Sequence, residues 1–147
     1  MPRQELRRGS DARERIVNAI IASRVTSDRL PDRRHVKRYL AQYFAHVPYE
    51  DLAGRSEPIM ARAALDHLEF GKTRRKGTAL LRIFNPTEDR SGYVSAFTFI
   101  EMVNDDMPFL VDSVVAAIAR QDIAVHITVH PVIRVTRDGR GRITGVP

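Results

Sequence analysis

The hydrophobic period of the chain changes at a short basic stretch, residues 72–77, and no other feature of the sequence limits the possible fold as strongly. Before this stretch, apolar residues recur every three or four positions, which places them on one face of an α-helix. After it, β-branched and aromatic residues form short runs typical of strands. We therefore expect a helical segment over 1–71, a basic linker over 72–77 and an α+β domain over 78–147.

The helical segment is expected to contain three amphipathic helices. Each has apolar residues at helical spacing, bounded by residues that favour helix ends. The boundary signals are Ser10-Asp11 at the start of the first helix, Pro31 and Pro48 around the second, and Ser56-Glu57-Pro58 and Gly71 around the third. The second helix has the clearest apolar stripe, formed by Val36, Tyr39, Leu40, Tyr43, Phe44 and Val47.

The α+β domain is expected to form one antiparallel sheet with a single crossover helix. The runs at 78–86 and 94–103 should pair as an antiparallel hairpin. A helix over 108–121 then leads to an alternating run at 123–136, and a glycine-containing turn leads to a last strand at 141–146. A right-handed crossover makes 94–103 parallel to 123–136, so the last strand should lie between them.

Such a sheet needs an apolar cover on both faces. The run at 94–103 carries apolar side chains on both sides, and the helix over 108–121 can cover only one of them. We expect the stripe from Val36 to Val47 to cover the other. The expected fold class is therefore α+β, with the N-terminal helices packed on the antiparallel sheet.

Composition excludes several classes of protein. The chain contains no cysteine, so disulfides, thiolate metal sites and cysteine nucleophiles are absent. No apolar run approaches the roughly 18 residues of a membrane span, and the first residues lack the apolar core of a secretory signal. A cytoplasmic protein without a membrane partner is expected.

The net charge of +6 raises an alternative function, a small basic α+β module that binds nucleic acid. Of the 24 Lys and Arg residues, 17 lie within residues 1–77, and several cluster at 33–38. A cationic helix face with aromatic residues can bind phosphates. The aromatic residues here share the apolar stripe and are better explained as core, so nucleic acid is the weaker interpretation.

Two histidines invite a metal hypothesis that geometry does not support. His126 and His130 lie four residues apart on an expected strand, about 13 Å along the chain, whereas zinc holds each ligand atom at about 2 Å. A shared ion would need ligands from elsewhere in the chain. The sequence also lacks a GxGxxG or GxxxxGK[ST] phosphate loop and a GxSxG elbow. We therefore assign no catalytic, cofactor-binding or metal-binding residue.

The loop before the expected crossover helix is the best candidate for a ligand site. It consists of Asn104, Asp105, Asp106, Met107, Pro108 and Phe109. Two carboxylates just before a helix usually cap it and complement its positive end, and this is the simpler interpretation. Free N–H groups at a helix start can also receive the carboxylate of an amino acid.

Four longer motifs identify a family. They are AHVPYEDL at 45–52, RIFNP at 82–86, VNDDMPFLVDSV at 103–114 and HPV at 130–132. Together they resemble the N-terminal region of the large bacterial NAD-specific glutamate dehydrogenases, over roughly residues 39 to 147. A strand, the 104–109 loop and an apolar helix in this order also resemble the first half of an ACT domain, a ferredoxin-like amino-acid-sensing module.

The resemblance implies an incomplete, βαββ version of the ACT-like sheet and a non-catalytic role. The parent polypeptide would convert L-glutamate and NAD to 2-oxoglutarate, ammonia and NADH in a distant domain, and this segment would hold no cofactor. Its partners would be the rest of that polypeptide, other copies in a homo-oligomer and possible amino-acid effectors. ACT modules bind amino acids at the loop that 104–109 occupies. Phe109 stands where ligand-binding modules usually have glycine, and it would crowd a bound amino acid.

Overall fold

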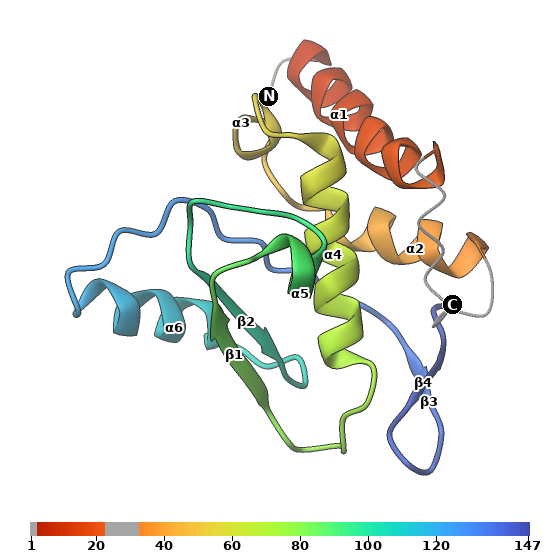
Figure 1. The fold of residues 1–147 in the computed structure, drawn as a ribbon, viewed down its shortest axis with the longest axis vertical. Coiled ribbons are helices and arrows are strands. Elements are labelled where there is room, and N and C mark those ends of the chain that lie inside the picture. The colour runs from red at the N-terminus through yellow and green to blue at the C-terminus, as the bar shows by residue number, and fades with distance from the viewer. Residues whose placement is uncertain (1–2, 23–32) are drawn as a thin grey trace.

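The computed structural model describes residues 3–22 and 33–147 (Figure 1). Its elements are α1 (Arg3–Ala22), α2 (Arg33–Tyr43), α3 (Tyr49–Leu52), α4 (Glu57–Gly71), β1 (Leu80–Phe84), α5 (Glu88–Ser91), β2 (Phe99–Val103), α6 (Leu110–Ala119), β3 (Thr136–Arg137) and β4 (Ile143–Gly145). The α+β class predicted from the sequence is confirmed. None of the helices in the described ranges is long and apolar enough to span a membrane.

The long helices follow the expected boundaries with one exception. α2 ends before Pro48, and α4 starts after Ser56 and ends at Gly71, as predicted. The predicted start of α1 at Ser10-Asp11 is wrong, because the helix already begins at Arg3. Residues 3–8 contain no proline or glycine, so the helix continues through the capping signal. The predicted start of the second helix at Pro31 lies outside the described residues.

The helical core is built by α1, α2 and α4. The buried stripe of α2 packs here, with Leu40 at 0% exposure, and Phe44 directly after the helix is 2% exposed. The Tyr39 hydroxyl donates to the Ala64 carbonyl at 2.8 Å, which satisfies a phenol that burial would otherwise penalise. Helix α4 lies between this core and the β1–β2 hairpin (Figure 1).

The β1–β2 hairpin is confirmed, with antiparallel register from Leu80 opposite Val103 to Phe84 opposite Phe99. The rest of the predicted sheet is wrong. β3 and β4 pair only with each other as a separate two-stranded sheet, so the last strand does not lie beside β2. Residues 93–98 and 123–135 form no strand.

The alternating run at 123–135 buries its apolar face in another way. Its odd-numbered side chains from Ile127 onward are half-buried, and Val129, Ile133 and Val135 pack against the helical core. An extended segment whose apolar side already contacts helices gains no further cover from joining a sheet. Pro131 also lacks the N–H group that a central strand would donate.

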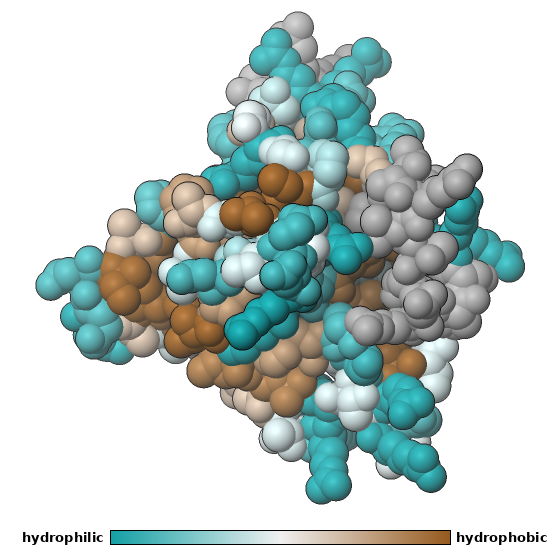
Figure 2. Space-filling view, viewed as in Figure 1, coloured by the Kyte–Doolittle hydropathy of each residue, from teal (hydrophilic) through white to brown (hydrophobic). Residues whose placement is uncertain are grey.

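The cover of the hairpin also differs from the prediction. α4, rather than the α2 stripe, lies against the inner face of β1–β2. The His67 ring is hydrogen-bonded to the Met102 carbonyl, and a Cβ at Gly71 would lie only 3.1 Å from the side chain of Val103. The outer face of the hairpin is open, since Leu81 and Ile83 are 60% and 63% exposed. Figure 2 shows apolar surface over the region of this hairpin and α6.

The basic linker at 72–77 is held by hydrogen bonds to the β3–β4 sheet. The Ile143 amide donates to the Lys72 carbonyl at 2.8 Å, and the Arg74 amide donates to the Gly141 carbonyl at 3.0 Å. Arg137 adds a donation from its guanidinium to the Gly71 carbonyl at 3.0 Å. Residues 72–77 are therefore an ordered part of the fold, hydrogen-bonded to the β3–β4 sheet.

Candidate functional site

The predicted ligand loop, residues 104–109, is held in place by Asp105. Its carboxylate accepts a hydrogen bond from the guanidinium of Arg74 and one from the Gly77 amide, the latter at 3.1 Å. These two bonds, the Arg74 one first, lower the pKa of Asp105. Arg74 also donates to the Thr78 carbonyl at 2.9 Å. The carboxylate of Asp105 thus fastens the loop to the basic linker.

The capping role predicted for Asp105 and Asp106 is wrong. The N-cap of α6 is Phe109, and no side chain caps the helix there. The helix begins only at Leu110, after Met107, Pro108 and Phe109, and the Asp105 carboxylate is bonded to Arg74 and Gly77 of the basic linker. Within the loop, the side-chain amide nitrogen of Asn104 lies 3.4 Å from the sulfur of Met107.

Phe109 has an unusual conformation. Its φ of 61° lies in the left-handed region, which costs a residue with a Cβ about 1 kcal/mol or more. Its side chain is 78% exposed, so no burial offsets that cost in this chain. The position thus adopts the geometry that glycine would take most easily.

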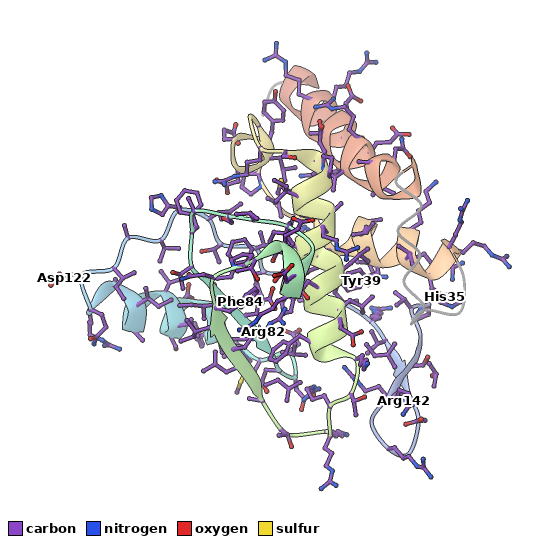
Figure 3. All side chains as sticks on the ribbon, viewed as in Figure 1. His35, Tyr39, Arg82, Phe84, Asp122 and Arg142 are labelled. Carbon is purple, nitrogen blue, oxygen red and sulfur yellow. The ribbon has the colours of Figure 1, made fainter. Side chains whose placement is uncertain are left out.

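Sequence reasoning missed a cluster of ionic side chains between α4 and the hairpin. Arg82 of β1 donates to Glu101 of β2 at 2.7 Å and to Asp66 of α4 at 2.7 Å. Its guanidinium lies over two rings, 4.7 Å from the centroid of Phe70 and 4.3 Å from that of Phe84. Figure 3 shows Arg82 and Phe84 on the hairpin near α4.

Burial governs the electrostatics of this cluster. Glu101 is 6% exposed, and the loss of solvent raises its pKa to about 7, although the hydrogen bond from Arg82 opposes the shift. Burial likewise raises the pKa of Tyr93, whose hydroxyl has no hydrogen-bond partner in the described part of the chain. The sequence did contain a signal for this pair. Each of the two apolar runs holds one charged residue, Arg82 in the first and Glu101 in the second, and these two residues lie opposite each other in the hairpin.

His67 joins α2, α4 and β2. Its Nε2 lies 3.1 Å from the Met102 carbonyl oxygen, which can only accept, so Nε2 carries the hydrogen. Its Nδ1 then accepts from the Tyr43 hydroxyl at 2.9 Å. Burial lowers the pKa of His67, because the positive charge would lose solvent. The neutral ring is therefore a structural bridge between three elements.

The other histidines of the metal hypothesis are separated from each other. His126 lies against Phe97, with ring centroids 4.7 Å apart, and His130 lies near His46 at the end of α2. Residues 3–22 and 33–147 contain no group of three or more histidine, aspartate or glutamate side chains that could hold a metal ion. The ionic cluster around Arg82 connects β1 to β2 and to α4.

Taken together, α6, the β1–β2 hairpin before it and the 104–109 loop between them form a small α+β unit that is consistent with an ACT-like domain. Residues 39–147 match the family described as glutamate dehydrogenase, ACT1 domain. The chain belongs to this family. The match contains the ionic cluster, the loop and both small sheets, and leaves out α1 and the first part of α2.

Two relatives carry the name NAD-specific glutamate dehydrogenase. The one from Halomonas elongata is 32% identical over 126 residues, which cover 86% of this chain and 8% of the relative. The one from Pseudomonas aeruginosa is 25% identical over 108 residues, which cover 74% of this chain and 7% of the relative. The chain thus spans less than a tenth of the length of these relatives. No solved structure matches it.

Proposed function

We propose that this chain is a non-catalytic regulatory or assembly segment of an NAD-dependent glutamate dehydrogenase. The reaction, in which L-glutamate and NAD give 2-oxoglutarate, ammonia and NADH, would take place in other parts of the polypeptide, where NAD would bind. This segment would hold no cofactor. Its partners would be those other parts and further copies in a cytoplasmic homo-oligomer. The family match and the names of the two relatives support this proposal.

The open outer face of the β1–β2 hairpin is the observation that carries the proposal. Its inner face is held to α4 by the half-buried ion pair between Arg82 and Asp66. On the outer face, Leu81, Ile83 and Ile100 are 60%, 63% and 41% exposed. A contiguous apolar surface on a rigid support is typical of a contact with another domain or subunit. The proposed role is therefore to position this segment within the assembled enzyme.

The test places a charge on that face in the parent enzyme. Ile83→Lys should lower the assembled mass measured by light scattering, or loosen the segment enough for proteolysis to release it. Ile59→Lys is the control, since Ile59 is also exposed, at 39%, but lies on α4. Assembly and proteolysis unchanged by Ile83→Lys would contradict the proposal, as would glutamate oxidation by the isolated chain.

The loop at 104–109 remains our proposed place for an amino-acid effector. Asp105 is occupied by Arg74 and Gly77, so a ligand ammonium group would have Asp106 as its available carboxylate. The exposed ring of Phe109 stands at the helix start where the ligand carboxylate would bind. We therefore propose weak binding, which calorimetric titration of the common amino acids would measure.

The nucleic-acid alternative has less support. Arg33, Lys37 and Arg38 form an exposed basic face on α2, but Tyr39 and Phe44 are buried in the core and cannot stack on bases. A titration of the chain with duplex DNA at 50 and 200 mM salt would test this function. Binding at low micromolar protein that weakens steeply with salt would favour it.

A further inference from the structure

A small pocket lies where the end of α2 meets the extended segment at 123–135. Its volume is about 200 Å³, and it is lined by Tyr43, His46, Val47, Thr128 and His130. Since a water molecule occupies about 30 Å³ in the liquid, the pocket has room for a solute of several non-hydrogen atoms. It is a different place from the loop at 104–109.

The walls of this pocket are fixed from both sides. On the helical side, Arg13 donates to the Val47 carbonyl at 2.8 Å, and Val47 itself is buried. On the other side, the Arg134 amide donates to the side-chain oxygen of Gln42 at 3.1 Å, and Val129 packs against the helical core. The pocket is therefore preformed, which reduces the entropy lost when a ligand binds.

Three side chains of the pocket, those of His46, Thr128 and His130, can donate hydrogen bonds. Thr128 and His130 are two residues apart on an extended segment and so project to the same side, and together with His46 they line the pocket as exposed residues. No carboxylate is among the lining residues. The guanidinium of Arg13 lies behind Val47, and its Nε is buried without a hydrogen-bond partner in the described part of the chain.

This set of groups suits an anion better than a metal ion. Zinc sites use three or four protein ligands and commonly include a charged one, whereas the pocket supplies two imidazoles and a hydroxyl. An oxyanion would accept hydrogen bonds from these groups and be attracted by the nearby guanidinium. His130 is joined in this pocket by His46, which lies 84 positions earlier in the chain.

We propose that this pocket binds a small oxyanion, either the carboxylate of an organic acid or inorganic phosphate. His46 and His130 donate to its oxygens from two different segments, and Thr128 supplies a third hydrogen bond. A bound anion would link the end of α2 to the extended segment. The proposal does not depend on the function proposed above.

The test uses the whole 147-residue chain with isotope-labelled histidine. Sodium phosphate and sodium succinate are titrated separately, with sodium chloride at matched ionic strength as the reference. We expect saturable NMR shifts at His46 and His130 with a dissociation constant of about 1 to 10 mM, equivalent to roughly 3 to 4 kcal/mol. Saturation with succinate alone indicates a carboxylate ligand, and with phosphate alone a phosphate ligand.

Variants decide whether the two histidines bind the anion. His46→Gln and His130→Gln should each weaken binding about fivefold or more, while the control His126→Gln should leave the dissociation constant unchanged. Melting temperatures identify any variant that does not fold, and the other single variant then carries the test. Shifts that do not saturate below 50 mM would overturn the proposal. Unchanged affinity in a folded variant, or binding of zinc without binding of either oxyanion, would also overturn it.

Discussion

Removal of the Glu101 carboxylate is the sharpest test of the ionic cluster. In wild type, Glu101 is 6% exposed and is bonded to Arg82 at 2.7 Å. Breaking a fully buried ion pair typically costs about 3–5 kcal/mol, because the remaining charge is left without its partner. Here Arg82 keeps Asp66, and its side chain is 28% exposed. We therefore expect Glu101→Ala to cost less than that, about 2 kcal/mol.

Thermal and urea unfolding followed by circular dichroism would measure this loss. At roughly 3 °C per kcal/mol for a chain of this size, the melting temperature should fall by about 6 °C. Asp106→Ala is the control, since Asp106 is an exposed carboxylate and its removal should change stability by less than about 0.5 kcal/mol. A loss for Glu101→Ala no larger than that of the control would refute the argument that Glu101 stabilises the fold through its ion pair with Arg82.

Three further predictions follow from the same structure. First, burial raises the pKa of Glu101 to about 7, so between about pH 4.5 and 7 the folded chain keeps a proton that the unfolded chain has lost, and wild-type stability should fall as pH rises through this range. Glu101→Gln should remove this pH dependence, and identical stability profiles for wild type and variant would contradict the prediction. Second, Phe109→Gly should raise the melting temperature by about 3 °C, because relief of the left-handed φ is worth about 1 kcal/mol and little burial is lost; a lower melting temperature would show that the ring packs in solution. Third, a fragment of residues 78–147 should aggregate or dimerise, because it exposes Val129, Ile133 and the inner face of the hairpin; a monomeric fragment that melts cooperatively would disprove this.

The sequence predicted those parts of the fold that depend on local signals. Ser56, Pro58 and Gly71 mark the ends of α4 by capping and backbone chemistry alone, and the β1–β2 pairing follows from two nearby β-prone runs. Over 123–135 the apolar alternation correctly indicated which side would be buried, from Ile127 onward. It could not indicate whether a strand or a set of helices would cover that side, because both produce the same pattern.

The candidate site was less predictable because it depends on contacts across the chain. Asp105 has the side chain and the position typical of a helix cap, yet it pairs with Arg74, which lies 31 residues earlier. The pairing of Arg82 with Glu101 could be predicted only after the hairpin register was known. The meeting of His46 and His130 required the full tertiary fold.

The basic linker has a mechanical consequence. It is hydrogen-bonded to the 104–109 loop through Arg74 and Gly77, and to the β3–β4 sheet through Lys72 and Arg74, while its first residue continues directly from α4. A flexible linker between two domains would let them move independently, whereas this stretch couples the end of α4, the 104–109 loop and the β3–β4 sheet to one another. Any displacement of the 104–109 loop must therefore either break the Asp105 contacts or carry the end of α4 and the terminal hairpin with it.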